Sequence, residues 1–164
     1  MIPEKYANHT FQMKAELSPD SLTLAYCCKS GEINLVDVQT GEHRALIQGD
    51  FQMVKKMAFS PDGRYLIVQE AYGAWGIYCF DLQMAEPRAE FPHMKDLASG
   101  DFAVDGLGNL AVSRREWIEI FDLADMKLLL RFRADHVVKS CTLRFIGTQL
   151  CVRTDAACLS LYPF

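Results

Sequence analysis

The chain has 164 residues, of which half are hydrophobic and 23% are charged, and its formal net charge at pH 7 is −4. This length is enough for one domain whose core needs neither a metal nor a disulfide. The negative charge argues against nonspecific binding to nucleic acid or to an anionic membrane surface. The first residues lack the apolar core of a secretory signal, and no apolar run approaches the roughly 20 residues that span a bilayer. We therefore expect a cytoplasmic protein with neither nucleic-acid nor membrane partners.

Short strands separated by turns are predicted from the start of the chain. Hydrophobic and polar residues alternate over 11–17, which is typical of a half-buried strand. A Ser-Pro-Asp turn at 18–20 follows, because proline presets φ and aspartate caps the backbone. Residues 22–28 are mostly apolar, so we expect a strand that is buried on both faces. Two further strands, 33–38 and 43–47, complete a four-stranded unit.

The same succession of strands and turns recurs three more times. Short strands with a turn about every 8 to 12 residues favour an all-β fold. Residues 125–133 include helix-forming types but also alternate, and we expect a strand there. Residues 51–58 are expected to form a loop that leads into a strand. The predicted strands of the second to fourth units are 54–59, 65–70, 77–82 and 88–91; 102–104, 109–113, 117–123 and 127–133; and 137–145, 149–153 and 158–161.

One sequence marker repeats along the chain: an aspartate follows an apolar run at Asp37, Asp81 and Asp122. A second marker, Ser-Pro-Asp, occurs at 18–20 and again at 60–62. Self-similarity with a period of about 40 residues is the signature of repeated supersecondary units. We expect the three aspartates to accept hydrogen bonds from backbone amides. Three aromatic residues at repeat-related positions are expected in the core: Phe59, Phe80 and Phe121.

The segment Val-Lys-Lys-Met-Ala-Phe-Ser-Pro-Asp-Gly at 54–63, together with the aspartate-ended third strands, resembles WD40 repeats. The resemblance covers 11–164 and implies an all-β β-propeller, in which four-stranded antiparallel blades surround an axis. Val36, Phe80 and Phe121 stand where the family has a tryptophan before its aspartate. The expected organisation is an N-terminal segment at 1–10, which could supply a closing strand, and four blades at 11–49, 51–93, 94–135 and 136–164.

Four blades of this type pose a geometric question, because blades shaped for a larger ring would form an open half-ring. Such a half-ring would leave two apolar blade faces uncovered. Two copies related by a twofold axis could cover both, with blade four of each copy meeting blade one of the other in a homodimer. Alternatively, the four blades could close into a compact ring, or another protein could complete the ring.

The loops that join second and third strands are the expected binding surface. In WD40-like folds, these loops share one face with the loops that lead from a fourth strand into the next blade. They carry aromatic and basic residues, the types enriched at protein-binding hot spots. Trp117 begins a strand, so we expect it to pack between blades rather than to bind. The candidate partner-binding residues are Lys29, Tyr72, Trp75, His93, Arg114, Arg115 and His136.

No residue pattern predicts a catalytic residue, a cofactor site or a metal site. The four histidines are dispersed, and among them we expect the repeat to bring only His93 and His136 near each other. The glycine-containing segment 106–108 reads as a turn, because no helix follows it. The six cysteines show no Cys-x-x-Cys spacing and lie mostly in apolar runs, so we expect reduced thiols.

The sequence therefore predicts a non-catalytic, WD40-like protein-interaction scaffold. It is expected to bind a protein or peptide through its loop-bearing face and to associate with itself through its first and last blades. Two alternatives remain open: a propeller enzyme of the lyase or hydrolase type with a central-pocket site, and a structural subunit that completes a larger propeller assembly.

Overall fold

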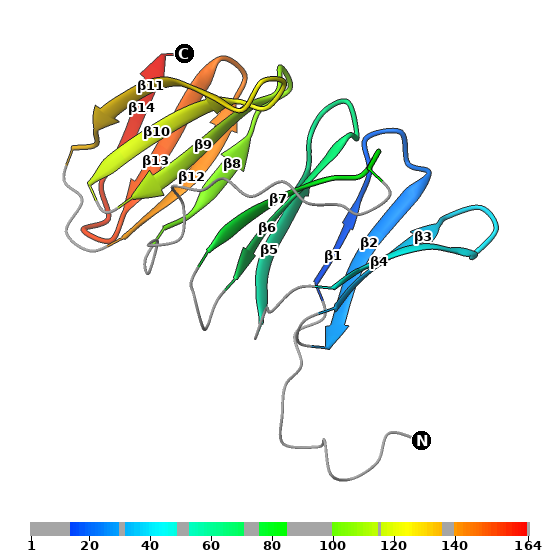
Figure 1. Cartoon of the computed structure of the whole chain (residues 1–164). Helices are drawn as coiled ribbons and strands as arrows, with labels where there is room; N and C mark the ends of the chain where they lie inside the picture. Colours follow the sequence, from blue (N-terminus) through cyan, green and yellow to red (C-terminus); the bar gives the residue numbers. More distant parts are fainter. Residues whose placement is uncertain are drawn as a thin grey trace, which may run out of the picture.

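The computed structural model describes residues 14–29, 32–48, 53–70, 76–84, 100–114, 116–135 and 140–163. These residues form fourteen strands in four antiparallel sheets (Figure 1). None of the described residues belongs to a helix long and apolar enough to cross a membrane.

The four sheets follow one another along the chain. Sheet one consists of β1 (Lys14–Leu17), β2 (Thr23–Lys29), β3 (Glu32–Asp37) and β4 (His43–Gln48). Sheet two consists of β5 (Val54–Phe59), β6 (Tyr65–Glu70) and β7 (Ile77–Asp81). Sheet three consists of β8 (Phe102–Val104), β9 (Asn109–Arg114), β10 (Trp117–Asp122) and β11 (Lys127–Arg133). Sheet four consists of β12 (Cys141–Ile146), β13 (Gln149–Thr154) and β14 (Leu159–Pro163).

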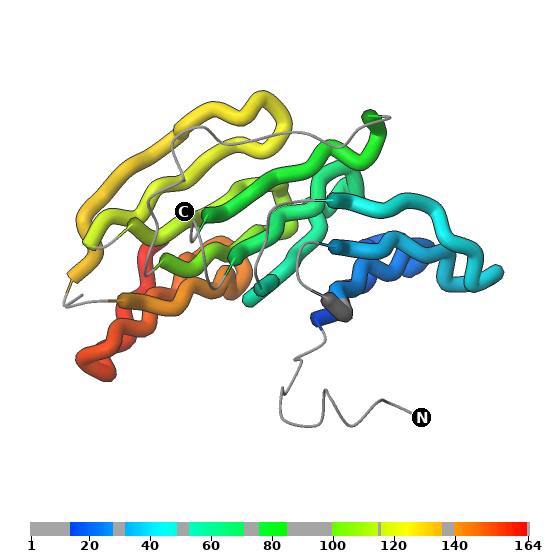
Figure 2. Tube along the Cα trace, turned by 60° about the horizontal axis from the view of Figure 1, so that its bottom comes forward, coloured from blue at the N-terminus to red at the C-terminus, as the bar shows by residue number. Residues whose placement is uncertain are grey.

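Each sheet is a meander, in which strands that follow one another in sequence are hydrogen-bonded neighbours. The first strands make the contacts between sheets: β1 lies against β5, β5 against β8, and β12 against β8 and β9. Figures 1 and 2 show the four sheets side by side in an open arc, with sheets one and four at opposite ends. Among the arrangements that the sequence left open, this arc matches the half-ring.

The antiparallel meanders place the strand connections along two opposite edges of the arc. We call the edge where first strands turn into second strands, and third into fourth, the turn face. We call the opposite edge, where second strands lead into third strands, the loop face. The strands β2, β6, β9 and β13 therefore all end at the loop face.

Most of the predicted strands are confirmed. The predictions 54–59, 65–70, 102–104 and 127–133 coincide with β5, β6, β8 and β11. Strand β11 forms despite its helix-forming residues because it pairs along the length of β10, which satisfies its backbone groups. The predicted strand 88–91 and the N-terminal segment 1–10 lie outside the described residues.

The repeated Ser-Pro-Asp motif forms the turn after the first strand. Ser18 Oγ donates to Asp20 Oδ1 at 2.6 Å and accepts a hydrogen bond from the Thr23 amide at 2.9 Å. Ser60 and Asp62 make the same arrangement before β6. Because short polar side chains satisfy the backbone here, the motif specifies a tight turn wherever it recurs.

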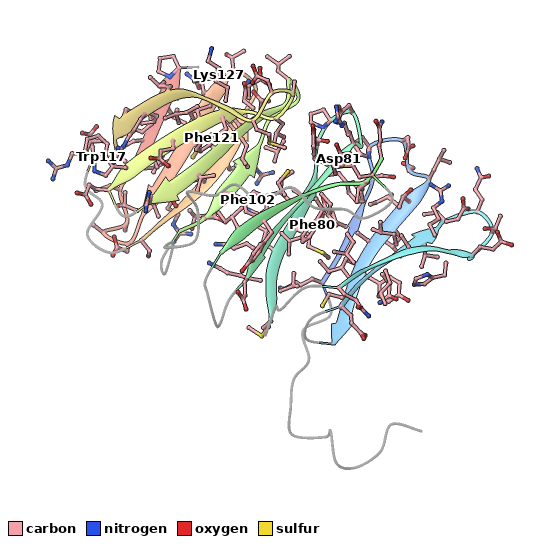
Figure 3. All side chains as sticks on the ribbon, in the orientation of Figure 1. Phe80, Asp81, Phe102, Trp117, Phe121 and Lys127 are labelled. Carbon is pink, nitrogen blue, oxygen red and sulfur yellow. The ribbon has the colours of Figure 1, made fainter. Side chains whose placement is uncertain are left out.

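The core consists of three layers, each between two successive sheets. Phe59 and Phe80 belong to the layer between sheets one and two, and Phe102 and Phe121 to the layer between sheets two and three (Figure 3). Aliphatic side chains such as Ile120 fill the layer between sheets three and four. The prediction that Phe59, Phe80 and Phe121 are core residues is confirmed, because all three are buried.

Strand β2 differs from the prediction that residues 22–28 are buried on both faces. Ala25 and Cys27 pack in the layer toward sheet two and are buried. On the other side, Leu24 and Tyr26 are only half-buried, and Leu22 is 38% exposed. The physical reason is position, because in the described part of the chain no sheet covers this side of sheet one.

Candidate functional site

The candidate partner-binding residues were assigned to the loop face, and the structure describes two of them. Lys29 is the last residue of β2, and Arg114 is the last residue of β9. Backbone pairing extends to both positions, with Lys29 opposite Glu32 and Arg114 opposite Trp117. The two residues therefore lie at the loop face, on sheets one and three, with sheet two between them. The other candidates lie outside the described residues: Tyr72, Trp75, His93, Arg115 and His136.

Trp117 begins β10 and packs within sheet three. The guanidinium carbon of Arg131 lies 4.5 Å from the centroid of the indole ring. The same guanidinium is 3.5 Å from the carboxylate of Glu119, which is buried. A cation over an aromatic face is a stabilising contact. This contact is with the neighbouring strand of its own sheet, and the packing of Trp117 between blades stays a prediction.

A buried carboxylate that the sequence analysis missed joins the first strands of three sheets. Asp101 immediately precedes β8, and its Oδ1 lies 3.0 Å from Lys56 Nζ of β5. Its Oδ2 accepts a hydrogen bond from the Leu143 amide of β12 at 3.0 Å. The Asp101 amide donates to Ser113 Oγ of β9 at 2.7 Å. Lys56 Nζ also donates to the Phe102 carbonyl and lies 4.8 Å from the centroid of that ring.

This cluster links neighbouring sheets through the hydrogen bonds of Asp101 and Lys56. Both carboxylate oxygens of Asp101 accept from neighbouring sheets, and Lys56 contacts two acceptors. Beside it, Gln69 donates to the Gly100 carbonyl, and its Oε1 has no hydrogen-bond partner in the described structure. The sequence signal was the pair of lysines in β5, because two adjacent residues of a strand point to opposite faces and one lysine must therefore lie on the packed side. Its partner, 45 residues away, could not be read from the sequence.

The three repeat-related aspartates accept hydrogen bonds from backbone amides, as predicted. Asp37 Oδ1 accepts from the Thr40 amide at 2.9 Å. Asp81 and Asp122 each accept from the amide two residues further along, at 3.0 and 2.8 Å. These carboxylates close the connections that follow the third strands and therefore shape the turn face.

Two of the aspartates also pair with arginines, which the sequence analysis did not identify as partners. Arg44 of β4 binds the Asp37 carboxylate, and Arg64 Nε and Nη2 contact Asp81 Oδ2 at 3.0 and 2.7 Å. Hydrogen bonds from the Thr40 amide and from Arg44 lower the pKa of Asp37 to about 2. The Arg64 hydrogen bond likewise holds the pKa of Asp81 below its usual range. Both carboxylates are therefore ionised at neutral pH.

Two pockets open on the turn face. One, of about 320 Å³, lies between sheets one and two, and its rim carries Asp20, Asp62 and Arg64. The other, of about 440 Å³, lies between sheets three and four and is lined by apolar groups that include Leu107 and Phe145. Both pockets are on the edge of the arc opposite the predicted binding surface.

Cys79 and Cys141 are buried thiols that pack as small residues in the core layers. Burial raises the pKa of Cys79 to about 12 and also raises the pKa of Cys141, so both remain protonated at neutral pH. Within the described ranges, no three His, Cys, Asp or Glu side chains come together as ligands for a metal ion. The pair His93 and His136 lies outside these ranges.

Comparison with known proteins gives sequence and structural relatives. No protein-family model matches the chain. The WD repeat-containing protein SL1-17 of Schistosoma mansoni is 30% identical over 113 residues, which are 69% of this chain and 37% of that protein. The structures of U3-55K and of the RRP9 WD40 repeats each superpose with a TM-score of 0.67 at 16% identity. These superpositions cover 95% of this chain and 53% and 52% of those chains. A Kuenenia stuttgartiensis hydrazine synthase superposes with a TM-score of 0.68 at 18% identity, over 91% of this chain and 45% of that chain.

These similarities define the class of protein. The four antiparallel sheets, stacked along an arc, are blades of a β-propeller. The repeats are WD40-like, because the curated relative that matches 113 residues of this chain is a WD repeat protein. The chain spans 37% of the length of that relative and 45% to 53% of the solved chains. The likeness to the hydrazine synthase, at 18% identity, concerns the fold alone.

Proposed function

We propose that this chain is a protein-interaction scaffold that binds a protein or a peptide through its loop face. The observation that carries the proposal is the position of Lys29 and Arg114 at the ends of second strands, on one edge of the arc. Strand pairing runs up to both residues, so the sheets order the backbone at these two positions before a partner binds. Preorganised groups lose little conformational freedom on binding, and a few of them can supply the affinity.

The chemistry of the candidate residues also supports this function. They are basic and aromatic, and such side chains bury large areas and form directed hydrogen bonds at interfaces. The net charge of −4 disfavours a nucleic acid as the partner, because phosphate binding depends on excess positive charge. A protein or peptide partner satisfies both observations.

The test compares loop-face variants with a control on the opposite edge. Arg114→Ala, Arg115→Ala and Trp75→Ala are each expected to weaken partner capture by about tenfold or more, the effect of losing a hot-spot contact. Lys127→Ala is the matched control, because Lys127 is an exposed cation at the start of β11 on the turn face (Figure 3). Capture from a cell extract is measured by quantitative mass spectrometry of the proteins retained on the immobilised chain.

A melting-temperature measurement separates binding from folding. Substitution at these three positions is expected to shift the melting temperature by no more than about 2 °C. The proposal fails if the loop-face variants capture the same proteins as strongly as the Lys127 variant does. It also fails if capture declines only in step with loss of the folded state.

A further inference from the structure

The two ends of the arc present sheet faces whose apolar side chains are uncovered. On sheet four, Leu159 and Leu161 are 66% and 52% exposed. On sheet one, Leu17 and Leu46 are 46% and 40% exposed. The facing residues between successive sheets are instead buried in three continuous layers. We call the uncovered sides the free face of sheet four and the free face of sheet one; Figure 2 shows these two sheets at opposite ends of the arc.

The free face of sheet four repeats a face that is buried elsewhere in the chain. In sheet three, Ile120 lies opposite Ala111, and both are fully buried in the layer toward sheet four. In sheet four, Leu161 occupies the equivalent position opposite Cys151. The register therefore places the side chain of Leu161 on the free face of sheet four. In sheet three, the equivalent side chain is that of Ile120, which packs against sheet four.

We call the packed layer between two successive sheets a joint. The free face of sheet one is equivalent to the side of sheet three that packs against the preceding sheet. In sheet three, Phe121 lies opposite Leu110, and both are buried in the layer toward sheet two. In sheet one, Val36 lies opposite Leu24 at the equivalent position, and both are only half-buried. One chain therefore carries both halves of an inter-sheet joint, one half at each end of its arc.

The free face of sheet four carries two arginines, and the free face of sheet one carries a glutamate. Arg144 and Arg153 are exposed on the free face of sheet four, where they alternate with buried residues of β12 and β13. On sheet one, Glu32 lies on the same side of β3 as Val36, because side chains four residues apart in a strand share a face. Apolar surfaces bearing opposite charges are electrostatically complementary, which favours their mutual recognition over other pairings.

We infer that this chain associates with a second copy of itself, with the free face of sheet four of one copy packed against the free face of sheet one of the other. A twofold pair buries both free faces of both copies in two equivalent joints. Each joint continues the sheet-to-sheet packing that already holds the chain together. The association uses the ends of the arc, so it goes beyond partner binding by the loop face and leaves that face open.

The test measures the mass of the whole chain in solution by light scattering after size-exclusion chromatography. At tens of micromolar, the wild-type chain is expected at twice its mass of 18.6 kDa. Leu161→Glu and Val36→Glu should each give single chains, because the joint would bury an unpaired charge. Leu129→Glu is the matched control and should stay dimeric, because Leu129 is 48% exposed on the outer strand β11, away from both free faces.

Mixing the two joint variants identifies which faces meet. Leu161→Glu keeps an intact sheet-one face, and Val36→Glu keeps an intact sheet-four face. An equimolar mixture should therefore recover part of the dimer, because one joint of each mixed pair is undamaged. If the two variants remain single chains when mixed, the pairing of unlike faces is wrong.

A charge reversal tests the joint without changing its apolar centre. Arg153→Glu alters an exposed side chain and should weaken the dimer several-fold, most strongly at low salt, because like charges then face each other. A monomeric wild-type chain, an unchanged dimer in Arg153→Glu, or equal dissociation in Leu129→Glu overturns the inference. The loop-face variants should leave the mass unchanged, so failure of this inference is distinguishable from failure of the proposed function.

Discussion

Asp37 shows how one side chain of the repeat serves both a turn and an ion pair. Its carboxylate accepts from the Thr40 amide to close the connection after β3, and it binds Arg44 of the next strand. Both interactions favour the ionised form, which lowers its pKa from 3.8 to about 2. The folded state therefore holds the carboxylate in its charged form more strongly than the unfolded chain does.

The stability of the fold is expected to depend on pH through this carboxylate. Because the folded-state pKa is the lower one, its contribution is fully present above about pH 5 and is lost as the pH falls from about 4 toward about 2. Asp37→Asn should lower the urea midpoint at neutral pH, and its difference from wild type should shrink across that acidic window. Urea unfolding followed at neutral pH and at successively lower pH tests this. A difference that stays constant down to the lowest pH contradicts the assignment.

At the scale of elements, the first strands are joined by a polar contact as well as by apolar packing. Asp101 links β5, β8 and β12 through Lys56 and the Leu143 amide. Lys56 is about a third exposed, so solvent weakens this pair relative to a fully buried one. The amide of Leu143 is buried, and it would lose its acceptor if the carboxylate were removed.

Asp101→Ala is expected to lower the free energy of unfolding by about 2 kcal/mol, because it leaves the buried Leu143 amide without its acceptor and removes the carboxylate that pairs with Lys56. Asp122→Ala is the control, since Asp122 accepts from an exposed amide on the turn face. Denaturant unfolding gives the energies, and hydrogen exchange reports the Leu143 amide directly. If Asp101→Ala costs no more than Asp122→Ala and the Leu143 amide keeps its protection, Asp101 does not join these strands.

At the scale of the whole molecule, stability comes from three joints between four sheets. Phe80 belongs to the first joint and Phe121 to the second. Each sheet contacts its neighbours along the arc, so a weakened joint affects the two sheets that it connects. The molecule is therefore expected to be more sensitive to losses at its joints than at its outer strands.

Truncation of a joint aromatic tests this expectation. Phe80→Ala and Phe121→Ala should each lower the free energy of unfolding by about 3–5 kcal/mol, because each leaves a cavity in a buried layer. Leu129→Ala on the outer strand β11 should change it by no more than about 0.5 kcal/mol. Denaturant titration measures all three. Losses below about 1 kcal/mol at both aromatic positions contradict the assignment of these layers as the core.

The proposed surfaces have a combined consequence for the assembled molecule. In a twofold ring, the loop faces of both copies lie on the same side, because each joint repeats the in-chain stacking of sheets. Such a scaffold presents two equivalent binding surfaces to one partner or to two. Linked sites raise the effective affinity without any new contact, provided that the partner spans them.

The sequence by itself determined the strands, the turns and the roles of the repeated aspartates. The recurring succession of strands and turns predicted β5 and β8 at their observed bounds, and the Asp37 and Asp122 acceptors were recognised from the repeat. These features depend on residues within a few positions of one another. The hydrogen bond from an aspartate to an amide in the following turn depends only on neighbouring residues, and so does the alternation of side chains along a strand.

Only the tertiary structure decided which apolar residues are covered and which charged groups meet. Ile120 and Leu161 occupy equivalent positions in their sheets, yet the first is buried and the second is half exposed. Asp101 meets the Leu143 amide across 42 residues of chain. Burial and ion pairing depend on which element lies opposite, and that is set by the packing of sheets distant in sequence. The order of sheets along the arc therefore decides which of these residues are buried and which charged groups pair, and local sequence patterns do not.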